Sequence, residues 1–122
     1  WHLLGYQDRM GETLAAADAI VSRAGATSLA EISALAIPAL LVPYPFATAD
    51  HQTTNARAWV ESGAAFMMPD DELGSDEFKA KLFALIDDAS VRESMVAAAR
   101  AQKTGEAAAA LADVVVGVAT AR

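Results

Sequence analysis

The sequence predicts an α/β fold in which a parallel sheet carries helices on both faces. Short apolar segments alternate with longer segments of helical periodicity, and this alternation is typical of successive β–α–β units. The apolar segments are continuous, as expected of strands that are buried on both sides. The chain has 122 residues, of which 54% are hydrophobic and 20% charged, so we expect one packed domain over residues 1–122. The sequence predicts three strands, whereas a sheet of this kind usually has about five. We therefore expect the domain to be incomplete at its N-terminal side.

The first part of the chain is expected to hold a helix, a strand and a second helix. The first helix is predicted by apolar residues at helical spacing, namely Tyr6, Met10, Leu14 and Ala17. Residues 19–22 are expected to form a buried strand, and residues 23–27 a tight turn in which Gly25 is free to take a positive φ. Ser28 is expected to open the next helix, and Pro38 to end it. The predicted inward residues of that helix are Leu29, Ile32, Leu35 and Ala36.

The middle of the chain repeats this order. Residues 39–42 are expected to form the second buried strand, which the prolines at 43–45 stop. A polar loop then leads into a helix whose apolar residues are Ala56, Trp59 and Val60. Gly63 stands where a helix C-terminus favours glycine, and residues 64–68 predict the third strand, followed by a turn. Residues 2–4 are expected to be the stub of a fourth strand.

The remainder of the chain is expected to be helical. Ser75 begins a helix whose predicted inward residues are Phe78, Leu82, Leu85 and Ile86. Ser90 and Thr104 are typical of later N-caps. The last helix carries an apolar stripe that consists of Leu111, Val114, Val115 and Val118. We expect this stripe to pack on the chain's own sheet. The alternatives are that it packs across a domain junction in a longer protein, or that it drives self-association of this chain.

Composition excludes several classes of function. Cysteine is absent and only two histidines occur, so we expect no disulfide, no metal site and no cofactor. The formal net charge of −7 and the pI of about 4.6 argue against binding nucleic acid or anionic lipid by bulk charge. No segment is apolar enough to span a membrane, so the chain itself is expected to be soluble. The first residue is Trp1 rather than methionine, which indicates a piece of a longer protein.

The first candidate site lies over residues 22–31, where a predicted strand passes through a turn into a helix. In a parallel sheet, ligands bind at the carboxyl ends of the strands. The free N–H groups of residues 26–28 would point out of a helix N-terminus and attract a phosphate. Glu31, one turn further, offers an acceptor for the paired hydroxyls of a ribose. The competing interpretation is that Ser28 and Glu31 form a capping box, which satisfies the helix's own amides.

The second candidate site lies over residues 50–55, again between a strand and a helix. Gln52 and Asn55 are three residues apart and share a helix face. Side-chain amides both donate and accept hydrogen bonds, as a pocket for sugar hydroxyls requires. His51 adds a titratable donor beside them. The competing interpretation is that Asp50 caps the helix and that the amides are solvated.

Other polar residues are less specific. Arg23 would either counter a phosphate charge or pair with a nearby carboxylate. The acidic run at residues 70–72 is expected to solvate a turn. The sequence contains no G-x-S-x-G elbow, phosphate-binding P-loop or G-x-G-x-x-G fingerprint, and we assign no residue a catalytic role.

Taken together, the two loops resemble the MurG family of N-acetylglucosaminyltransferases. The matching segments are residues 22–26 with Glu31, residues 37–43, residues 50–52 with 55–56, and residues 63–65. Residues 6–10 also match an aromatic-x-Asp-x-Met segment that precedes this region in the family. At Phe46, many relatives carry a histidine or another polar residue instead. The resemblance covers nearly the whole chain, and its combined spacing is more specific than any one segment.

The resemblance implies a partial Rossmann-like sheet, the C-terminal donor-binding half of a two-domain GT-B glycosyltransferase. The residues that it assigns to UDP-N-acetylglucosamine are Gln7, Ala26, Thr27, Ser28, Glu31, His51, Gln52 and Asn55. By position, the backbone of Gln7 would meet the uracil, and residues 26–28 the diphosphate. Glu31 would take the ribose hydroxyls, and Gln52 hydroxyls of the sugar.

The resemblance also implies a reaction for the parent protein. The family moves N-acetylglucosamine from UDP-N-acetylglucosamine to lipid-linked N-acetylmuramyl pentapeptide (lipid I to lipid II). This step of peptidoglycan synthesis serves cell wall biogenesis, cell shape and cell division, at the cytoplasmic face of the bacterial cell membrane. The acceptor domain is expected to be absent here, so the isolated chain is expected to be inactive. Two alternatives stay open: the donor domain of another GT-B transferase that acts on a lipid-linked glycan or glycolipid, and a non-enzymatic α/β interaction module.

Overall fold

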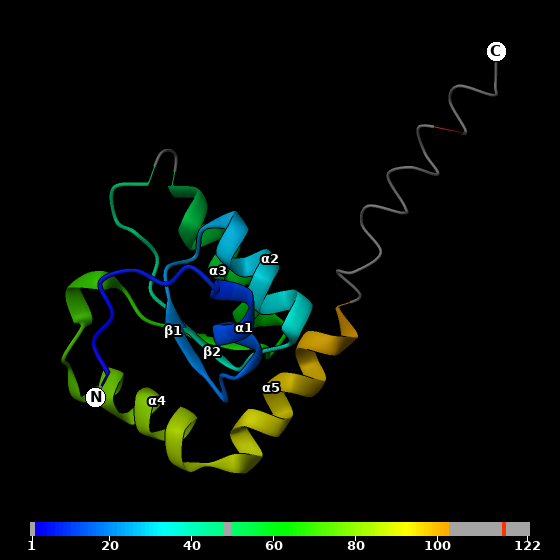
Figure 1. Ribbon diagram of the computed structural model, residues 1–122. Coiled ribbons are helices and arrows are strands. Elements are labelled where there is room, and N and C mark those ends of the chain that lie inside the picture. The colour runs from blue at the N-terminus through cyan, green and yellow to red at the C-terminus, as the bar shows by residue number, and fades with distance from the viewer. Residues whose placement is uncertain (1, 48–49, 103–115, 117–122) are drawn as a thin grey trace.

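Three parallel strands form the centre of the protein in the computed structural model (Figure 1). The structure describes residues 2–47, 50–102 and 116. The strands are β1 (Ile20–Ser22), β2 (Ala39–Leu41) and β3 (Ala65–Met67), and they lie in that order in the sheet. Ser22 is in register with Leu41, and Leu41 with Met67, so all three strands end at one edge. The predicted parallel sheet is therefore confirmed, but the prediction that its first strand is buried is wrong, because Val21 of β1 is 48% exposed.

Helices connect the strands and cover the sheet on both faces. They are α1 (Met10–Ala15), α2 (Ala26–Leu35), α3 (His51–Glu61), α4 (Asp76–Asp87) and α5 (Ala89–Ala101). In Figure 1, α2 and α3 lie on one side of the sheet and α4 lies on the other. The short 3-10 helix η2 (Asp70–Glu72) joins β3 to α4. Each parallel pair of strands is thus joined by a helical crossover, as the alternation in the sequence predicts.

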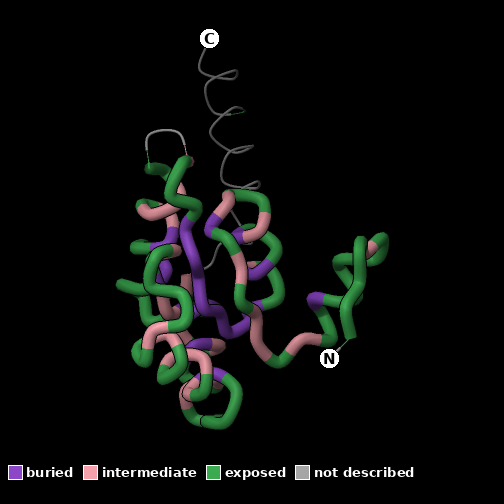
Figure 2. The backbone as a smooth tube through the Cα atoms, turned by 90° about the vertical axis from the view of Figure 1, so that its left-hand side faces the viewer, coloured by how far each residue is buried: buried purple, intermediate pink, exposed green. Residues whose placement is uncertain are grey.

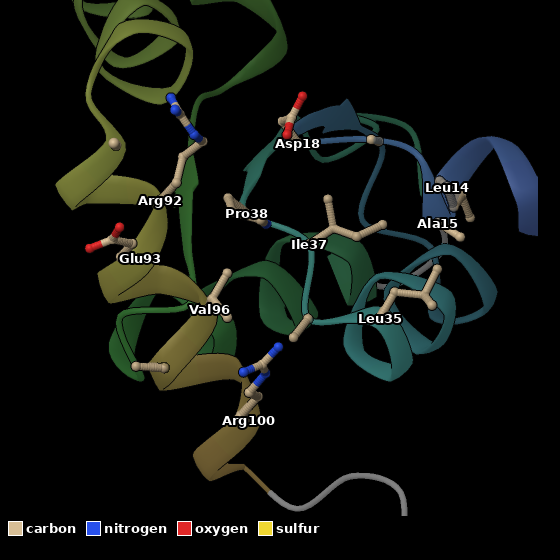
Figure 3. Close-up of a pocket in the computed structure, with 14 residues that line it drawn as sticks. Leu14, Ala15, Asp18, Leu35, Ile37, Pro38, Arg92, Glu93, Val96 and Arg100 are labelled. Carbon is tan, nitrogen blue, oxygen red and sulfur yellow. The ribbon is translucent and has the colours of Figure 1, made fainter.

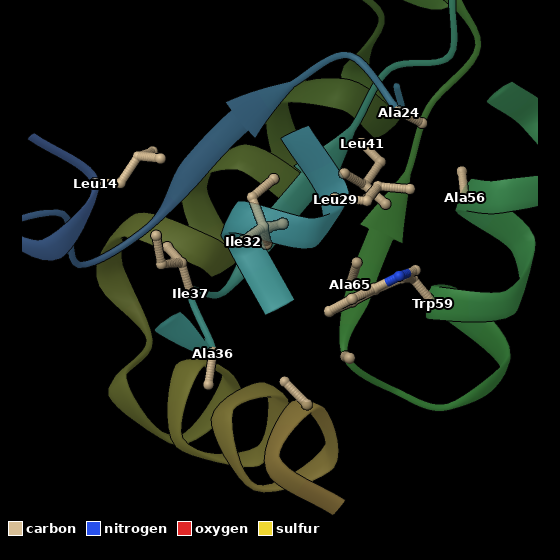
Figure 4. Close-up of a cluster of buried hydrophobic side chains, with 13 residues drawn as sticks. Leu14, Ala24, Leu29, Ile32, Ala36, Ile37, Leu41, Ala56, Trp59 and Ala65 are labelled. Atoms are coloured by element: carbon tan, nitrogen blue, oxygen red, sulfur yellow. The ribbon is translucent and has the colours of Figure 1, made fainter. Parts of the chain in front are cut away.

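The alternating side chains of β2 divide the core into two clusters. Leu41 packs into the cluster with Ile32 of α2 and Trp59 of α3 (Figure 4). Leu40 points to the other face and packs with Leu85 of α4. Because both faces of the central strand are covered, all of its side chains are apolar, which explains the continuous apolar pattern.

The N-terminal segment lies largely outside this core. Residues 2–4 do not form a strand, so the predicted stub of a fourth strand is wrong. The predicted first helix is present as α1, but it spans only Met10–Ala15 and does not include Tyr6 or Ala17. Leu3 is 97% exposed and Tyr6 is 83% exposed, whereas Leu14 is buried. Figure 2 shows the segment apart from the packed body and exposed along most of its length. Helical spacing alone does not hold a helix where no surface covers its apolar side.

The turn between β1 and α2 also differs from its prediction. Gly25 has φ −68° and ψ 147°, an extended conformation rather than a positive φ, and it is the N-cap of α2. The helix therefore begins before Ser28, which lies within the first turn. No side chain caps α2, so the capping box of Ser28 and Glu31 is not formed. A glycine cap leaves the first amides to other acceptors, whereas a serine cap would consume one of them.

The caps of the later helices are formed by side chains or by glycine. Gly63 follows α3 with φ 80°, and the hydroxyl of Ser75 accepts a hydrogen bond from Phe78 N at 3.1 Å, both as predicted. Ser90 is not an N-cap, because Asp88 fulfils that role and accepts from Ser90 N at 2.8 Å. Hydrogen bonds from the Ser90 hydroxyl and from the helix amides lower the pKa of Asp88.

Leu35 and Ile86, which were expected to face inward, are more than a third exposed, and so is Val60, an apolar residue of the third predicted helix. Each of them is adjacent in sequence to a buried residue. Because successive helical residues point about 100° apart, such a neighbour lies at the margin of the buried face and not within it. The other predicted inward residues of α2 and α4 are buried or half-buried. Thr104 and the apolar stripe at residues 111–118 lie outside the residues that the structure describes.

Candidate functional site

The N-terminus of α2 opens at the carboxyl edge of the sheet. The first intrahelical hydrogen bond runs from Leu29 N to Gly25 O at 2.9 Å. The amides of Ala26, Thr27 and Ser28 precede it, and no described residue accepts from them. Their positions on the surface leave them accessible, since Ala26 and Thr27 are exposed. Aligned free amides at a helix start carry a positive partial charge and suit an anionic ligand.

Glu31 lies on the same side of α2 as this helix start. It follows Thr27 by four residues and Ser28 by three, so the three residues share a helix face. Its side chain is exposed and has no hydrogen bond or ion pair within the described part of the chain. The carboxylate is therefore available to accept hydrogen bonds from two neighbouring hydroxyl groups of a ligand.

The first turn of α3 is tied to both loops at this edge. Gln52 Oε1 accepts from Tyr44 N at 3.0 Å, in the loop after β2. Asn55 Nδ2 donates to Ala24 O at 3.4 Å, in the loop after β1. Asp50 occupies the N-cap position of α3 with φ 52°, as the competing interpretation expects, but its side chain accepts no hydrogen bond from the helix. The structure thereby brings Asn55 beside the start of α2.

These two amides keep part of their hydrogen-bonding capacity. Gln52 uses its oxygen and Asn55 uses its nitrogen in the contacts above, which leaves a donor on Gln52 and an acceptor on Asn55. Both side chains are half-buried. His51 is exposed and is the first residue of α3. A ligand hydroxyl group, which both donates and accepts hydrogen bonds, can therefore find an acceptor and a donor in this arrangement.

Gln7 is not joined to this group by the structure. Its Oε1 accepts from Arg9 N at 3.2 Å, within the exposed N-terminal segment. No described hydrogen bond links Gln7 to the loops after β1 and β2. Its predicted contact with a base stays a prediction.

Arg23 connects the loops that follow all three strands. Its Nη1 donates to Val42 O and to Pro43 O, each at 3.3 Å, and pairs with a carboxylate oxygen of Asp70 after β3. Its guanidinium carbon lies 5.6 Å from the centre of the Tyr44 ring. Arg23 therefore pairs with a carboxylate, one of its two predicted roles, and Asp70 does more than solvate a turn. Sequence reasoning missed this link because the two residues are far apart in the chain.

Two cavities among the described residues lie at different ends of the sheet, and the one of greater volume lies at the end opposite the candidate site. It measures about 610 Å³ and is lined by α1, the end of α2 and α5, with Arg92 and Arg100 among its residues (Figure 3). A second cavity of about 490 Å³ runs between α2 and α3 and is lined by Ala26, Asn55 and Trp59 among others. The second cavity adjoins the candidate site, whereas the first lies near the amino ends of β1 and β2.

The described residues provide neither a metal centre nor a membrane span. They contain no group of three or more His, Cys, Asp or Glu side chains placed to hold a metal ion. None of the helices described is both long and apolar enough to cross a bilayer.

Comparison with known proteins identifies a family for nearly the whole chain. A family model described as the glycosyltransferase family 28 C-terminal domain matches residues 1–113. Two curated relatives carry the name UDP-N-acetylglucosamine--N-acetylmuramyl-(pentapeptide) pyrophosphoryl-undecaprenol N-acetylglucosamine transferase. The one from Carboxydothermus hydrogenoformans is 48% identical over 85 residues, 70% of this chain and 23% of the relative. The one from Chlorobium phaeobacteroides is 44% identical over 108 residues, 88% of this chain and 30% of the relative.

A solved structure has the same arrangement of elements. The crystal structure of Acinetobacter baumannii MurG superimposes with a TM-score of 0.72 at 29% sequence identity. The match covers 81% of this chain and 28% of that protein. The chain thus spans less than a third of the length of these proteins.

Proposed function

Because this chain belongs to the glycosyltransferase family 28 C-terminal domain family, we propose that it binds the UDP-N-acetylglucosamine donor of a glycosyl transfer. The parent reaction would move N-acetylglucosamine to a lipid-linked N-acetylmuramyl pentapeptide in peptidoglycan synthesis. The observation that carries the proposal is the free N-terminus of α2 at the carboxyl edge of the sheet, with Glu31 on the same helix face.

The start of α2 would hold the diphosphate. The amides of residues 26–28 have no described acceptor, and the helix dipole adds to their attraction for an anion. Gly25 supports this role, because its backbone is extended and an added Cβ would meet no atom within 4 Å. Neither conformation nor internal packing therefore requires a glycine at this position. A ligand that approaches the backbone closely would require one.

The hydroxyl groups of the ligand would meet the polar side chains around this helix start. Glu31 would accept from the ribose hydroxyls, four residues after Thr27. Gln52 would donate to the sugar, and Asn55 would accept from it, since those are the capacities that their contacts leave free. His51 would assist at the sugar, and Gln7 would meet the uracil through its backbone once the N-terminal segment is placed beside the site.

The chemistry assigned to this chain is the stabilisation of the leaving group. In the proposed reaction, a hydroxyl of the acceptor attacks the anomeric carbon, the bond to the diphosphate breaks, and UDP leaves with an added negative charge. The amides at the start of α2 would stabilise that charge as it develops. Other parts of the parent protein would bind the acceptor and the membrane surface and would supply any catalytic base. The reaction would take place at the cytoplasmic face of the membrane. The proposed roles in cell shape and cell division follow from this one step.

A titration with UDP tests the proposal. We expect UDP to raise the melting temperature of the chain, and Glu31→Gln to reduce the effect. The matched control is Glu61→Gln, an exposed glutamate at the end of α3 that should leave UDP binding unchanged. Replacement of UDP by 2′-deoxy-UDP should weaken binding to the original chain and have little effect on Glu31→Gln. An interaction module that binds no nucleotide would show no shift with either ligand.

A further inference from the structure

We propose that the ring of Phe46 binds the apolar face of the sugar carried by the nucleotide donor, and so selects a sugar nucleotide over the free nucleotide. The proposal deepens the donor-binding function proposed above and rests on it. Phe46 lies in the loop between β2 and α3, at the carboxyl edge of the sheet, and is 82% exposed. Phe46 lies outside the helices and strands and belongs to neither cluster of the core, so packing of the fold does not explain an apolar side chain at this position.

Exposure alone does not indicate a binding role, because single exposed apolar residues are common on protein surfaces. Phe83 of α4 shows this, since it is 56% exposed and no described ring or cation contact holds it. Phe46 differs because its ring contacts a second aromatic ring. Its centre lies 5.7 Å from that of Tyr44, with the two planes 72° apart, which is the edge-to-face geometry that aromatic pairs prefer.

The aromatic pair is anchored to the sheet through Arg23. The guanidinium carbon lies 5.6 Å from the centre of the Tyr44 ring, within the range of a cation–π interaction. Arg23 is itself fixed to the backbone after β2 and to Asp70 after β3. The exposed face of Phe46 is therefore supported by a series of contacts that begins in the loops of the site. A side chain with such a contact has less freedom to lose on binding than one with none.

The polar groups proposed for the sugar are linked to the same loop. Gln52 Oε1 accepts from Tyr44 N at 3.0 Å, two residues before Phe46. Asn55, one turn further along α3, donates to Ala24 O beside the start of α2. Asn55 and Gln52 of α3 thus connect the loop before α2 with the loop that carries Phe46. The proposal places the sugar of the donor between these two loops.

The chemistry of a pyranose matches this combination. Equatorial hydroxyls point outward from the rim of the ring, where side-chain amides can bind them, and the two faces present C–H groups. The C–H hydrogens carry a partial positive charge, and the face of a phenyl ring is negative, so the two surfaces attract each other as they exclude water. Binding sites for small molecules commonly combine an apolar wall with a few polar groups that fix orientation.

The test compares UDP with UDP-N-acetylglucosamine by titration calorimetry on the full 122-residue chain. The measured quantity is the ratio of the two dissociation constants. We expect Phe46→Ala to reduce the preference for the sugar nucleotide by about three- to ten-fold, the range of a single aromatic contact. Phe46→Trp should retain the preference, and Phe83→Ala, the matched control, should change neither constant. Because Phe46 is exposed, Phe46→Ala should unfold at the same temperature as the original chain without ligand.

The outcomes separate the two proposals. An unchanged ratio in Phe46→Ala, with UDP still bound, would overturn the stacking and leave the donor-binding function in place. If Phe46→Ala weakened the binding of UDP and of UDP-N-acetylglucosamine equally, the ring would contact the nucleotide or support the loop. That result would also overturn the inference. Failure of the original chain to bind either ligand would overturn the proposed function and the inference that rests on it.

Discussion

The contact between Arg23 and Asp70 gives a prediction whose magnitude follows from the structure. The pair joins the loop after β1 to η2, with the two side chains 47% and 33% exposed. An ion pair at that exposure contributes about 0.2–1 kcal/mol to stability. The two hydrogen bonds to the carbonyl oxygens of Val42 and Pro43 are at the long end of the range, at 3.3 Å, so we take about 0.5 kcal/mol for each.

These values predict how strongly each of three variants lowers the free energy of unfolding. Arg23→Ala removes the ion pair, both hydrogen bonds and the contact with Tyr44, and should lower the free energy of unfolding by about 2 kcal/mol. Asp70→Asn removes only the ion pair and should lower the free energy of unfolding by about 0.2–1 kcal/mol. The double variant should resemble Arg23→Ala alone, because the partner of Asp70 is already gone.

Urea unfolding of the original chain, both single variants and the double variant measures these values as a double-mutant cycle. The account predicts a coupling free energy of about 0.2–1 kcal/mol between the two residues, which falls in high salt. Additive effects would refute the reasoning, since they would show that the two side chains act independently. So would an Asp70→Asn variant as unstable as Arg23→Ala.

Other predictions concern the site, the core and the caps. Gly25→Ala should fold normally, because an added Cβ has open space and φ is −68°, yet UDP should bind more weakly by calorimetry. Leu40→Ala removes a side chain that is 0% exposed and should lower the free energy of unfolding by about 2–5 kcal/mol in urea. Gly63→Ala should cost about 1 kcal/mol through its φ of 80° alone, because the nearest atom to the new Cβ lies at an ordinary 3.8 Å. The pKa of Asp88 is lower in the folded chain than in the unfolded one, so its contribution to stability is present above the ordinary pKa of an aspartate and is lost as the pH falls through the folded value. A pH series of melting temperatures should therefore be flatter in acid for Asp88→Asn than for the original chain.

The strands were predictable because their signal is dense and local. Every residue of β2 is buried on one face or the other, so its apolar pattern has no interruption. The first helix was less predictable, since Tyr6 and Met10 have the right spacing but no surface covers them. Helical periodicity records which residues prefer burial, and the packing partners decide whether burial occurs.

The candidate site was partly predictable for the same reason. The position of α2 after a strand and a glycine indicated free amides at the carboxyl edge, and the structure places the start of that helix there. The choice between Gly25 and Ser28 as the cap depends on backbone conformation, which the motif does not specify. The link from Arg23 to Asp70 spans 47 positions along the chain and depends on the order of the strands. Likewise, no sequence pattern shows that Phe46 is exposed and that Tyr44 supports it.

An NMR titration with UDP, in which the backbone amide chemical shifts are recorded, tests the central claim most directly because it locates the ligand. The account predicts that the largest shifts occur at the amides of Ala26, Thr27 and Ser28, which start α2 at the carboxyl edge. Shifts confined to the larger cavity at the opposite end, at Arg92 and Arg100, would contradict the account, as would the absence of any shift at UDP concentrations well above those that sugar nucleotides reach in cells.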